Sequence, residues 1–312
     1  MKTGGHLFED IRRLFPGRCY ADIPLSRFTS FGIGGLADIV VEPENVACLA
    51  ELIRHLHDRG IPRIILGAGT NVLFPDSGFR GVVIRTNCLK NFGIKTNGSD
   101  SAIISAGAGV NLFTVIGRTC LSGFTGLESL WGIPGSLGGA VAVNAGSGGV
   151  CACDFLEQVV LLTYAGNEIR IKKTDLDFGY RRMKLPADSV IVEGTFRLVN
   201  GVSGTIKGSI RAAMKRRRTE QPWRQPSAGC VFRNPSLEKP AGAMIDRLGF
   251  KGVQVGGAQV SEIHANFIIN RGNALASDVL ELVHKIRERV REAEGIELEL
   301  EICVITQDQH YD

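Results

Sequence analysis

The chain has 312 residues, which is enough for two or three compact units. A hydrophobic share of 44% and a charged share of 22% are typical of globular proteins and exclude a disordered or fibrous chain. The net charge of +4 is too small to indicate nucleic-acid binding. No segment is apolar for long enough to cross a bilayer, and the eight scattered cysteines lack the CxxC spacing of zinc sites. We expect a cytoplasmic protein with free thiols, no metal and no membrane contact.

The first third of the chain alternates strand and helix patterns. Strands are predicted at 38–42, 63–67, 81–85 and 102–106. Between the first two, Pro43 introduces a helix whose apolar side chains recur at helical spacing until Gly60 ends it. A predicted hairpin at 156–172 turns at 165–167, and 188–198 is its expected partner strand.

The pattern changes near residue 204. A helix carrying Lys215–Arg218 precedes a loop, and a helix and strands follow. Ser277 or Asp278 is expected to cap a long helix that Gly295 ends, and a last strand is predicted at 297–304. This mixture predicts an α+β fold with a domain boundary at about 203.

A first glycine cluster directly follows a predicted strand. It contributes the candidate ligand-binding residues Gly67, Ala68, Gly69, Thr70 and Asn71. A Rossmann fingerprint is excluded, because Val72 occupies the third glycine position and no acidic residue lies about twenty positions further on. The successive amides of this loop are nevertheless suited to bind an anion.

A second cluster, at 126–146, predicts another anion site. Its candidate residues are Pro134, Gly135, Ser136, Gly138, Gly139 and Asn144. Because a helix is expected to begin at the paired glycines, its first amides are expected to be unpaired and available to a phosphate. Each glycine alone also fits a packing role. Two such sites in one domain favour the diphosphate of a dinucleotide.

Seven segments together resemble the UDP-N-acetylenolpyruvoylglucosamine reductase (MurB) family, in the family's order. They are TSFGIGGLAD (29–38), LGAGTNVL (66–73), GLESLWGIPGSLGGAVAVNAG (126–146), FGYRRMKL (178–185), PSAGCVFRNP (226–235), GGAQVSEIHANFIIN (256–270) and GIELELE (295–301). The resemblance implies a two-lobed FAD-binding domain of the vanillyl-alcohol-oxidase type and an α+β substrate domain. We expect these at 1–203, with lobes of about 1–86 and 87–203, and at 204–312. The short connection after Tyr180 matches the shorter, type II, subtype.

The same resemblance implies the reaction. FAD would take a hydride from NADPH and pass it to the methylene carbon of UDP-N-acetyl-3-O-(1-carboxyvinyl)glucosamine. The product would be UDP-N-acetylmuramate, a precursor of the peptidoglycan cell wall. Negative charge then builds toward the substrate carboxylate, so the site needs a cation there and a proton donor over the adjacent carbon.

Three residues match the family's catalytic positions. Arg181 would bind the carboxylate with its planar, permanently charged fork, although an isolated arginine is more often a surface residue. Cys230 stands where many members have serine, and its thiol is a stronger acid than a hydroxyl, although a lone cysteine is usually inert core. Glu301 shares a predicted strand face with Glu297 and Glu299, which favours a solvated edge. The resemblance instead implies that Glu301 enters the site with a raised pKa.

Tyr180, Arg233, Asn234 and His264 match or lie near substrate contacts of the family. His264 fits an ordinary packed histidine equally well, and no second ligand at metal spacing accompanies it. One or two side chains of Lys215–Arg218 would bind the diphosphate, although such a run is usually a solvated helix face. No obligate protein partner is expected.

Three alternatives stay open at this point. The chain could be an oxidase or dehydrogenase on the same FAD fold, a non-catalytic flavin or sugar-nucleotide sensor, or an RNA-binding protein. The C-terminal motifs disfavour the first, and the presence of Arg181 and Glu301 disfavours the second. The third depends only on 215–218, which lacks interleaved aromatic residues.

Overall fold

The computed structural model describes residues 3–98 and 100–306. They fall into two compact units, each assembled from separate stretches of the chain. Unit 1 takes its described residues from 1–21, 39–68 and 81–215, and unit 2 from 22–38, 69–80 and 216–312. Two early stretches of the chain, 22–38 and 69–80, thus belong to the same unit as the C-terminal residues. Residues 204–215, which follow the expected boundary near 203, belong to unit 1.

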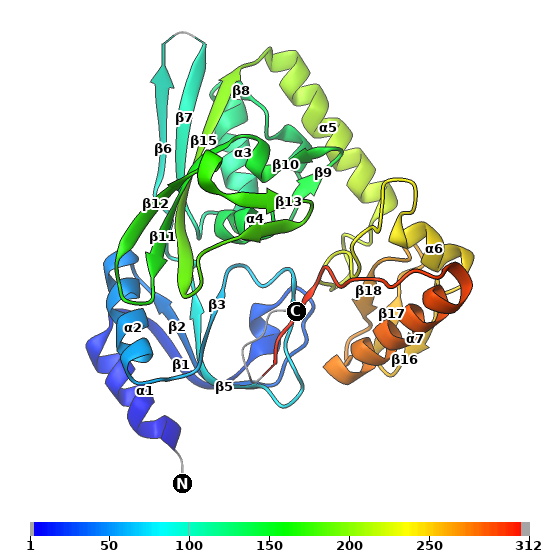
Figure 1. Cartoon of the computed structure of the whole chain (residues 1–312), viewed down its shortest axis with the longest axis horizontal. Coiled ribbons are helices and arrows are strands. Elements are labelled where there is room, and N and C mark those ends of the chain that lie inside the picture. Colours follow the sequence, from blue (N-terminus) through cyan, green and yellow to red (C-terminus); the bar gives the residue numbers. More distant parts are fainter. Residues whose placement is uncertain (1–2, 99, 307–312) are drawn as a thin grey trace. The chain divides into compact units, whose positions relative to one another are not determined.

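The first sheet lies mostly in unit 1 (Figure 1). Its strand order is β1 (Gly17–Pro24), β2 (Leu36–Pro43), β5 (Phe79–Arg85), β3 (Arg63–Leu66). Helices α1 (Thr3–Leu14) and α2 (Val46–Asp58) contribute apolar side chains to the same core. The Asn45 side chain caps α2 by accepting from the Cys48 amide at 2.9 Å, so this helix begins and ends as its pattern predicts.

The second sheet of unit 1 has six strands. Five follow the order β12 (Glu168–Lys172), β11 (Leu156–Thr163), β15 (Ser189–Asn200), β7 (Ser101–Gly107), β6 (Phe92–Asn97), and β8 (Phe124–Thr125) pairs with β15. Helices α3 (Leu112–Leu121) and α4 (Leu137–Ala142) lie together on one side of this sheet, where α4 packs against β15 and β7 (Figure 1). The predicted hairpin and its partner strand are confirmed by the pairing of β11 with β12 and β15.

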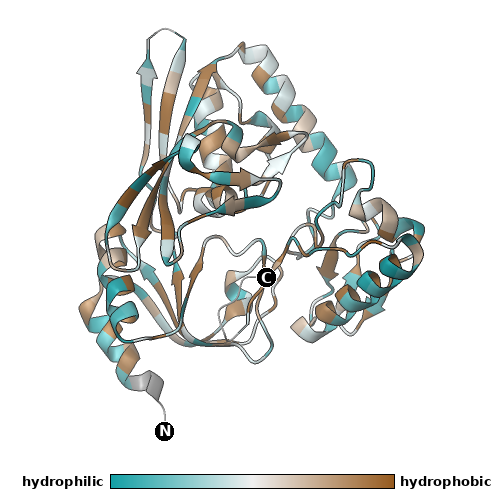
Figure 2. Cartoon of the chain, viewed as in Figure 1, coloured by the Kyte–Doolittle hydropathy of each residue, from teal (hydrophilic) through white to brown (hydrophobic). Residues whose placement is uncertain are grey.

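Short elements complete unit 1. They are the hairpins β9 (Gly146–Ser147) with β10 (Val150–Cys151) and β13 (Asp177–Gly179) with β14 (Arg182–Lys184), and the 3-10 turns η2 (Glu128–Leu130), η3 (Ala152–Asp154) and η4 (Lys173–Asp175). Helix α5 (Ser203–Glu220) begins in unit 1 and ends in unit 2. It buries only Ile206 and Ala213 and is largely hydrophilic in Figure 2.

Unit 2 is built around α7 (Ala276–Glu294). The helix packs on a three-stranded sheet of β16 (Gln254–Val255), β17 (Ala258–Val260) and β18 (Ile268–Asn270). Helix α6 (Ala241–Arg247), the turn η1 (Leu25–Phe28) and the parallel pair β4 (Val72–Leu73) and β19 (Cys303–Val304) complete the unit. Gly295 ends α7 in the left-handed conformation, with φ 65°, as predicted.

Mixed helices and strands in both units confirm the α+β class. The cap expected at Ser277 or Asp278 is wrong by two or three residues, because Leu275 precedes the helix and Asp278 accepts from the Leu275 amide at 3.0 Å. Asp76 adds to this cap by accepting from the amides of Ala276 and Ser277 at 2.7 and 3.0 Å. Over the described ranges, no helix has the length and apolar character that a bilayer span requires.

The predicted strand 297–304 is also wrong over most of its length. Only β19 is a regular strand there, and Leu300 forms an isolated bridge to Phe232. The amides of Glu301 and Ile302 both point to the Val231 carbonyl, at 2.8 and 3.4 Å. Two residues opposite one partner interrupt the pleat, so alternation does not decide which way Glu301 faces.

Candidate active site

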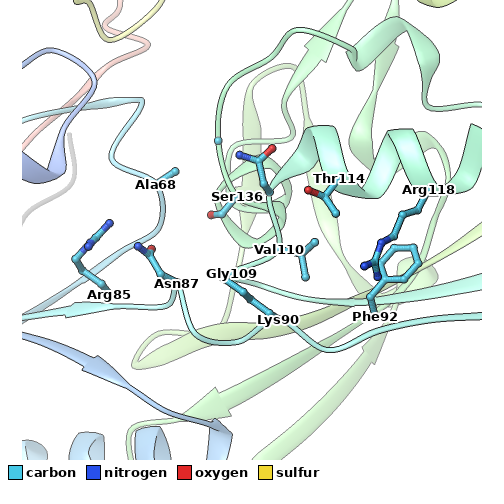
Figure 3. A pocket seen from close by; sticks show the side chains of 12 residues that line it. Ala68, Arg85, Asn87, Lys90, Phe92, Gly109, Val110, Thr114, Arg118 and Ser136 are labelled. Carbon is cyan, nitrogen blue, oxygen red and sulfur yellow. The ribbon is translucent and has the colours of Figure 1, made fainter. Parts of the chain in front are cut away.

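Residues from the two glycine clusters meet in unit 1. A Cβ at Gly67 would lie only 2.5 Å from Ser136 Oγ, so the backbone of one loop passes directly over the side chain of the other. Both loops contribute to a pocket of about 390 Å³ (Figure 3). Its lining residues are Ala68, Arg85, Asn87, Lys90, Phe92, Gly109, Val110, Asn111, Thr114, Arg118, Gly135 and Ser136.

The pocket is cationic. Arg85 forms an ion pair with the buried Glu42, while the guanidinium of Arg118 lies 4.9 Å from the centre of the Phe92 ring. Lys90 is exposed at the same pocket. With the hydroxyl and amide side chains beside them, these groups match the needs of a nucleotide diphosphate. The residues present therefore fit the expected dinucleotide.

Sequence reasoning missed most of this lining. The segment Gly107-Ala108-Gly109 begins at the last residue of strand β7, much as Gly67-Ala68-Gly69 comes directly after β3. That repetition of a strand and a GxG turn was the available signal, and Gly109 and the residues after it line the pocket. No sequence motif includes Arg85, Lys90 or Arg118. These residues come together at the pocket only in the folded structure.

The unpaired amides expected at the start of α4 are largely used within the protein. The amide of Leu137 donates to the Val110 carbonyl at 2.8 Å, and that of Gly138 donates to Ala108 at 2.9 Å. A Cβ at Gly138 would lie 2.7 Å from the Ala108 Cβ. This glycine therefore serves close packing, which was the alternative interpretation. The Gly139 amide donates to Ser136 Oγ at 3.4 Å.

The end of the first glycine loop belongs to unit 2. The Gly69 carbonyl accepts from the Ser30 amide at 2.9 Å, and Thr70 follows it in the chain. The Asn71 side chain donates from Nδ2 to the Glu301 carbonyl at 3.0 Å, and the main-chain carbonyl of Asn71 accepts from the Cys303 amide at 2.9 Å. Asn71, predicted to bind the cofactor, is thus bonded to the segment that carries a predicted catalytic residue.

Arg181 lies in the two-residue turn between β13 and β14. Its backbone is left-handed, with φ 53°, a conformation that is unfavourable for a residue with a Cβ. Its Nη2 donates to the Gly146 carbonyl at 2.9 Å. A Cβ at Gly146 would lie 3.3 Å from Arg181 Nη1 and 2.7 Å from Cys151 Sγ, so only glycine fits beside this half-buried guanidinium.

Asn144 supports the same turn. It is buried and left-handed, with φ 42°. Its Nδ2 donates to the Gly179 carbonyl at 2.8 Å, and its Oδ1 accepts from the Cys153 amide at 3.1 Å. Both ends of this side chain therefore bind protein backbone. Tyr180, in the same turn, is 53% exposed, and its ring centre lies 5.6 Å from the Arg181 guanidinium.

Unit 2 brings the segments of Cys230 and Glu301 together. The Glu301 amide donates to the Val231 carbonyl at 2.8 Å, and the Arg233 amide donates to the Glu299 carbonyl at 2.9 Å. These are antiparallel neighbours, with Cys230 one residue before the shared contact. Residues 71 positions apart in the chain are thereby placed on adjacent segments.

The three glutamates of the last segment are not equivalent. Glu297 forms an ion pair with Arg287 at 3.0 Å, and Glu299 forms one with Arg233 at 3.2 Å. Both of these carboxylates are exposed, whereas Glu301 is half-buried. Glu301 therefore differs from its neighbours, although the direction of its side chain stays a prediction.

The predicted substrate contacts of unit 2 have internal bonds. Asn234 Oδ1 accepts from the Ala241 amide at 3.0 Å, at the start of α6. The His264 ring accepts on Nδ1 from the Asn266 amide at 3.2 Å. Burial, followed by the charge of Lys251, lowers the pKa of His264. The ring is therefore neutral at pH 7, with its proton on Nε2.

The basic run lies at the end of α5. Lys215, Arg216 and Arg218 are exposed, and the guanidinium of Arg218 lies 5.5 Å from the Trp223 ring centre. Arg217 donates to Gln221 Oε1 at 2.9 Å. Within the part of the chain that the structure describes, no group of three or more histidine, cysteine or acidic residues is placed to hold a metal ion.

Known proteins resemble the chain over nearly its whole length. The model of the UDP-N-acetylenolpyruvoylglucosamine reductase C-terminal domain matches residues 221–305, and a FAD binding domain model matches 37–172. UDP-N-acetylenolpyruvoylglucosamine reductase of Syntrophus aciditrophicus is 36% identical over 96% of each chain. That of Chlamydia muridarum is 40% identical over 93% of this chain and 96% of its own. The crystal structure of MurB from Thermus caldophilus is 31% identical, has a TM-score of 0.79, and is matched over 94% of this chain and 100% of that one. The chain belongs to the UDP-N-acetylenolpyruvoylglucosamine reductase (MurB) family.

Proposed function

We propose that this protein reduces UDP-N-acetyl-3-O-(1-carboxyvinyl)glucosamine to UDP-N-acetylmuramate in peptidoglycan synthesis, with FAD as cofactor and NADPH as electron donor. The observation that carries the proposal is the hydrogen bond from the Glu301 amide to the Val231 carbonyl, at 2.8 Å. It sets an acid and a thiol on adjacent segments of a chain that belongs to this family. An enolate-like intermediate needs such a pair of groups, a proton donor and a neutral acid that does not repel the developing charge.

The cofactor part is proposed to be 1–203, with 204–312 as the substrate part. The cationic pocket of unit 1 is the proposed site of the FAD diphosphate, with Arg85, Lys90 and Arg118 as the compensating charges. The turn of Gly135 and Ser136 and the loop at Gly67 supply the close backbone approach. When bound, FAD supplies the hydride transfer between NADPH and the substrate.

Arg181 is proposed to bind the substrate carboxylate. Its guanidinium is already oriented by the Gly146 carbonyl and by a constrained backbone, so little reorganisation is needed when negative charge develops. An arginine stays charged throughout the reaction and can form two parallel hydrogen bonds to a carboxylate.

Cys230 is proposed to donate the proton, and Glu301 to stay neutral beside the developing charge. A thiol loses its proton far more readily than the serine hydroxyl that many members of the family carry. An ionised Glu301 would repel the developing enolate, so the protonated form favours the reaction. This gives the half-burial of Glu301 a chemical purpose that Glu297 and Glu299 do not share.

Substrate binding is proposed to involve Tyr180, Arg233, Asn234 and His264, with one or two residues of Lys215–Arg218 at the diphosphate. The Arg233–Glu299 ion pair would have to exchange for a phosphate contact. An exposed ion pair contributes little stability, so this exchange costs little. We further propose a cytoplasmic location and action without an obligate protein partner.

A visible spectrum and two half-reactions test the function. The purified protein should carry a flavin spectrum that NADPH bleaches and that returns, under anaerobic conditions, when the enolpyruvyl nucleotide is added. Recovery with oxygen alone would instead support an oxidase on the same fold. A protein that remains colourless after reconstitution with FAD would refute both.

A further inference from the structure

Asn266 bonds the segment of the proposed proton donor from both ends of its side chain. It is buried, with 3% of its surface exposed. Its Oδ1 accepts from the Phe232 amide at 2.9 Å, and its Nδ2 donates to the Phe232 carbonyl at 2.8 Å. We propose that Asn266 is a positioning residue, which fixes the main chain of the Cys230 segment so that the thiol meets the substrate. The proposal rests on the function proposed above.

The contacts of Asn266 reproduce one rung of a β-ladder. Its carboxamide forms with Phe232 the pair of hydrogen bonds that a neighbouring strand would form with a peptide unit. Its own carbonyl accepts from the Val231 amide at 2.8 Å, and the next residue, Phe267, bridges to Cys230. Three consecutive residues, 230–232, are therefore held on this side, while Glu301 holds Val231 from the other.

The segment needs such support because glycine precedes it. Gly229 has φ 83°, and no atom lies within 4 Å of where its Cβ would be, so no side-chain packing restrains the backbone at this position. A proton donor must be placed to within about 0.5 Å for full effect. The two side-chain hydrogen bonds of Asn266 supply that restraint at Phe232, two residues after the cysteine.

Asn266 is itself held in place. Its amide donates to His264 Nδ1 at 3.2 Å, and the His264 amide donates to Ser261 Oγ at 3.4 Å. The His264 ring packs edge-on against Phe267, with the ring centres 5.0 Å apart. A Cβ at Gly242 would lie 2.9 Å from this ring, so α6 closes the other side. We call the paired hydrogen bonds between the Asn266 side chain and Phe232 the clamp. Packed neighbours thus hold the clamp in place.

The experiment compares Asn266→Asp with the matched control Asn270→Asp. Asn270 is also buried, but its side chain bonds Phe31, Gly272 and Ala274, away from Cys230. Stopped-flow absorbance follows flavin reduction by NADPH and reoxidation by the enolpyruvyl nucleotide. At pH 8 we expect N266D to slow reoxidation at least about tenfold, since small misplacements of this kind reach 10²-fold, and to leave reduction unchanged. N270D should change neither rate.

A pH profile separates positioning from general damage. A protonated carboxyl group offers one donor and one acceptor, as the amide does, whereas a carboxylate facing the Phe232 carbonyl is repelled. Burial raises the pKa of such a carboxyl, so the working form of N266D is present at low pH and is lost as the pH rises. The wild-type to N266D rate ratio should therefore fall toward one as the pH is lowered to about 5.5. A ratio independent of pH would overturn the proposal.

A double-mutant cycle shows whether the effect passes through the thiol. In a Cys230→Ala background the donor is absent, so N266D should cause no further loss of reoxidation rate. An equal further loss would overturn the proposal. If N266D does not fold, Asn266→Ser replaces it in the cycle, since it removes the paired contact without adding a charge.

Hydrogen exchange gives a readout that does not depend on the reaction. The Phe232 amide donates to Asn266 Oδ1, and the Val231 amide donates to the main-chain carbonyl of Asn266. Asn266→Ser removes the side-chain acceptor, so peptides spanning residues 231 and 232 should exchange faster in Asn266→Ser than in N270D. Equal exchange would refute the clamp. If the wild-type flavin is not reoxidised by the enolpyruvyl nucleotide, the proposed function fails, and the exchange result still decides whether Asn266 restrains the segment.

Discussion

The two units hold their proposed catalytic residues in different ways. In unit 1 an anchor is on the reactive group itself, because the Arg181 guanidinium donates to the Gly146 carbonyl. In unit 2 two side-chain amides hold the backbone of the reactive segments: Asn266 holds Phe232, and Asn71 holds the Glu301 carbonyl. Side-chain amides perform this task because they can bond a peptide group from both their oxygen and their nitrogen.

The difference matches the chemistry proposed for each unit. A guanidinium stays charged, so it can be oriented by a carbonyl and still bind a carboxylate with its other nitrogens. A proton donor has one hydrogen to give. If its side chain donated that hydrogen in a strong bond to another protein group, that group would compete with the substrate. Fixing the neighbouring backbone orients the donor without using that hydrogen.

The largest effect is expected from the directly anchored residue. Arg181→Ala should slow flavin reoxidation by the enolpyruvyl nucleotide by about 10²–10³-fold, the usual cost of losing one group that stabilises developing negative charge. Reduction by NADPH should change much less. Arg182→Ala is the matched control, since Arg182 is exposed and pairs with Asp177 at 2.8 Å. Equal losses in the two variants, or in the two half-reactions, would argue against the assignment.

Replacing the thiol should have the next largest effect. Cys230→Ala should slow reoxidation by about 10²-fold, the lower range of general acid catalysis, whereas Cys230→Ser should keep substantial activity because a hydroxyl can also donate. Cys120→Ser serves as control, because burial raises the pKa of the Cys120 thiol to about 11 and this residue lies in α3. Stopped-flow rates decide the matter, and full activity in C230A would remove Cys230 from the mechanism.

Asn144 tests whether backbone support matters in unit 1 as well. Asn144→Gly removes both side-chain bonds but tolerates the left-handed backbone, so we expect reoxidation to slow about tenfold through a displaced Arg181 turn. Asn144→Ala should show the same kinetic loss and also a lower melting temperature, because alanine disfavours that φ by about 1–2 kcal/mol. Wild-type reoxidation in N144G would mean that the direct anchor suffices.

The smallest effect concerns the pH dependence of stability. Burial lowers the pKa of His264 below its ordinary value of 6.5, so folding favours the neutral ring. Its contribution to stability should be complete above pH 6.5 and lost as the pH falls through 6.5 toward the lower folded value. Thermal unfolding from pH 8 to 5 should show this slope in the wild type and a shallower one in His264→Gln. Parallel curves would contradict the assignment.

Local pattern was enough for most elements. The apolar spacing after Pro43, the turn at 165–167 and Gly295 each marked an element that the structure contains. Each of these features depends on residues only a few positions apart in the sequence, so the local sequence is enough to predict it. The last strand was mispredicted because a contact with Val231, 70 residues away from Glu301, interrupts its pleat.

The sequence by itself determined the α+β class, the family and the residues proposed for catalysis, because these are written in short, ordered motifs. Only the tertiary structure decided which of the candidate residues bond or pack against protein and which residues line the pocket. Gly138 and Asn144, predicted as cofactor contacts, pack or bond inside unit 1, while Arg85 and Arg118 line its pocket without any motif. The reason is physical: a polar group's role depends on whether another part of the chain reaches it before a ligand does.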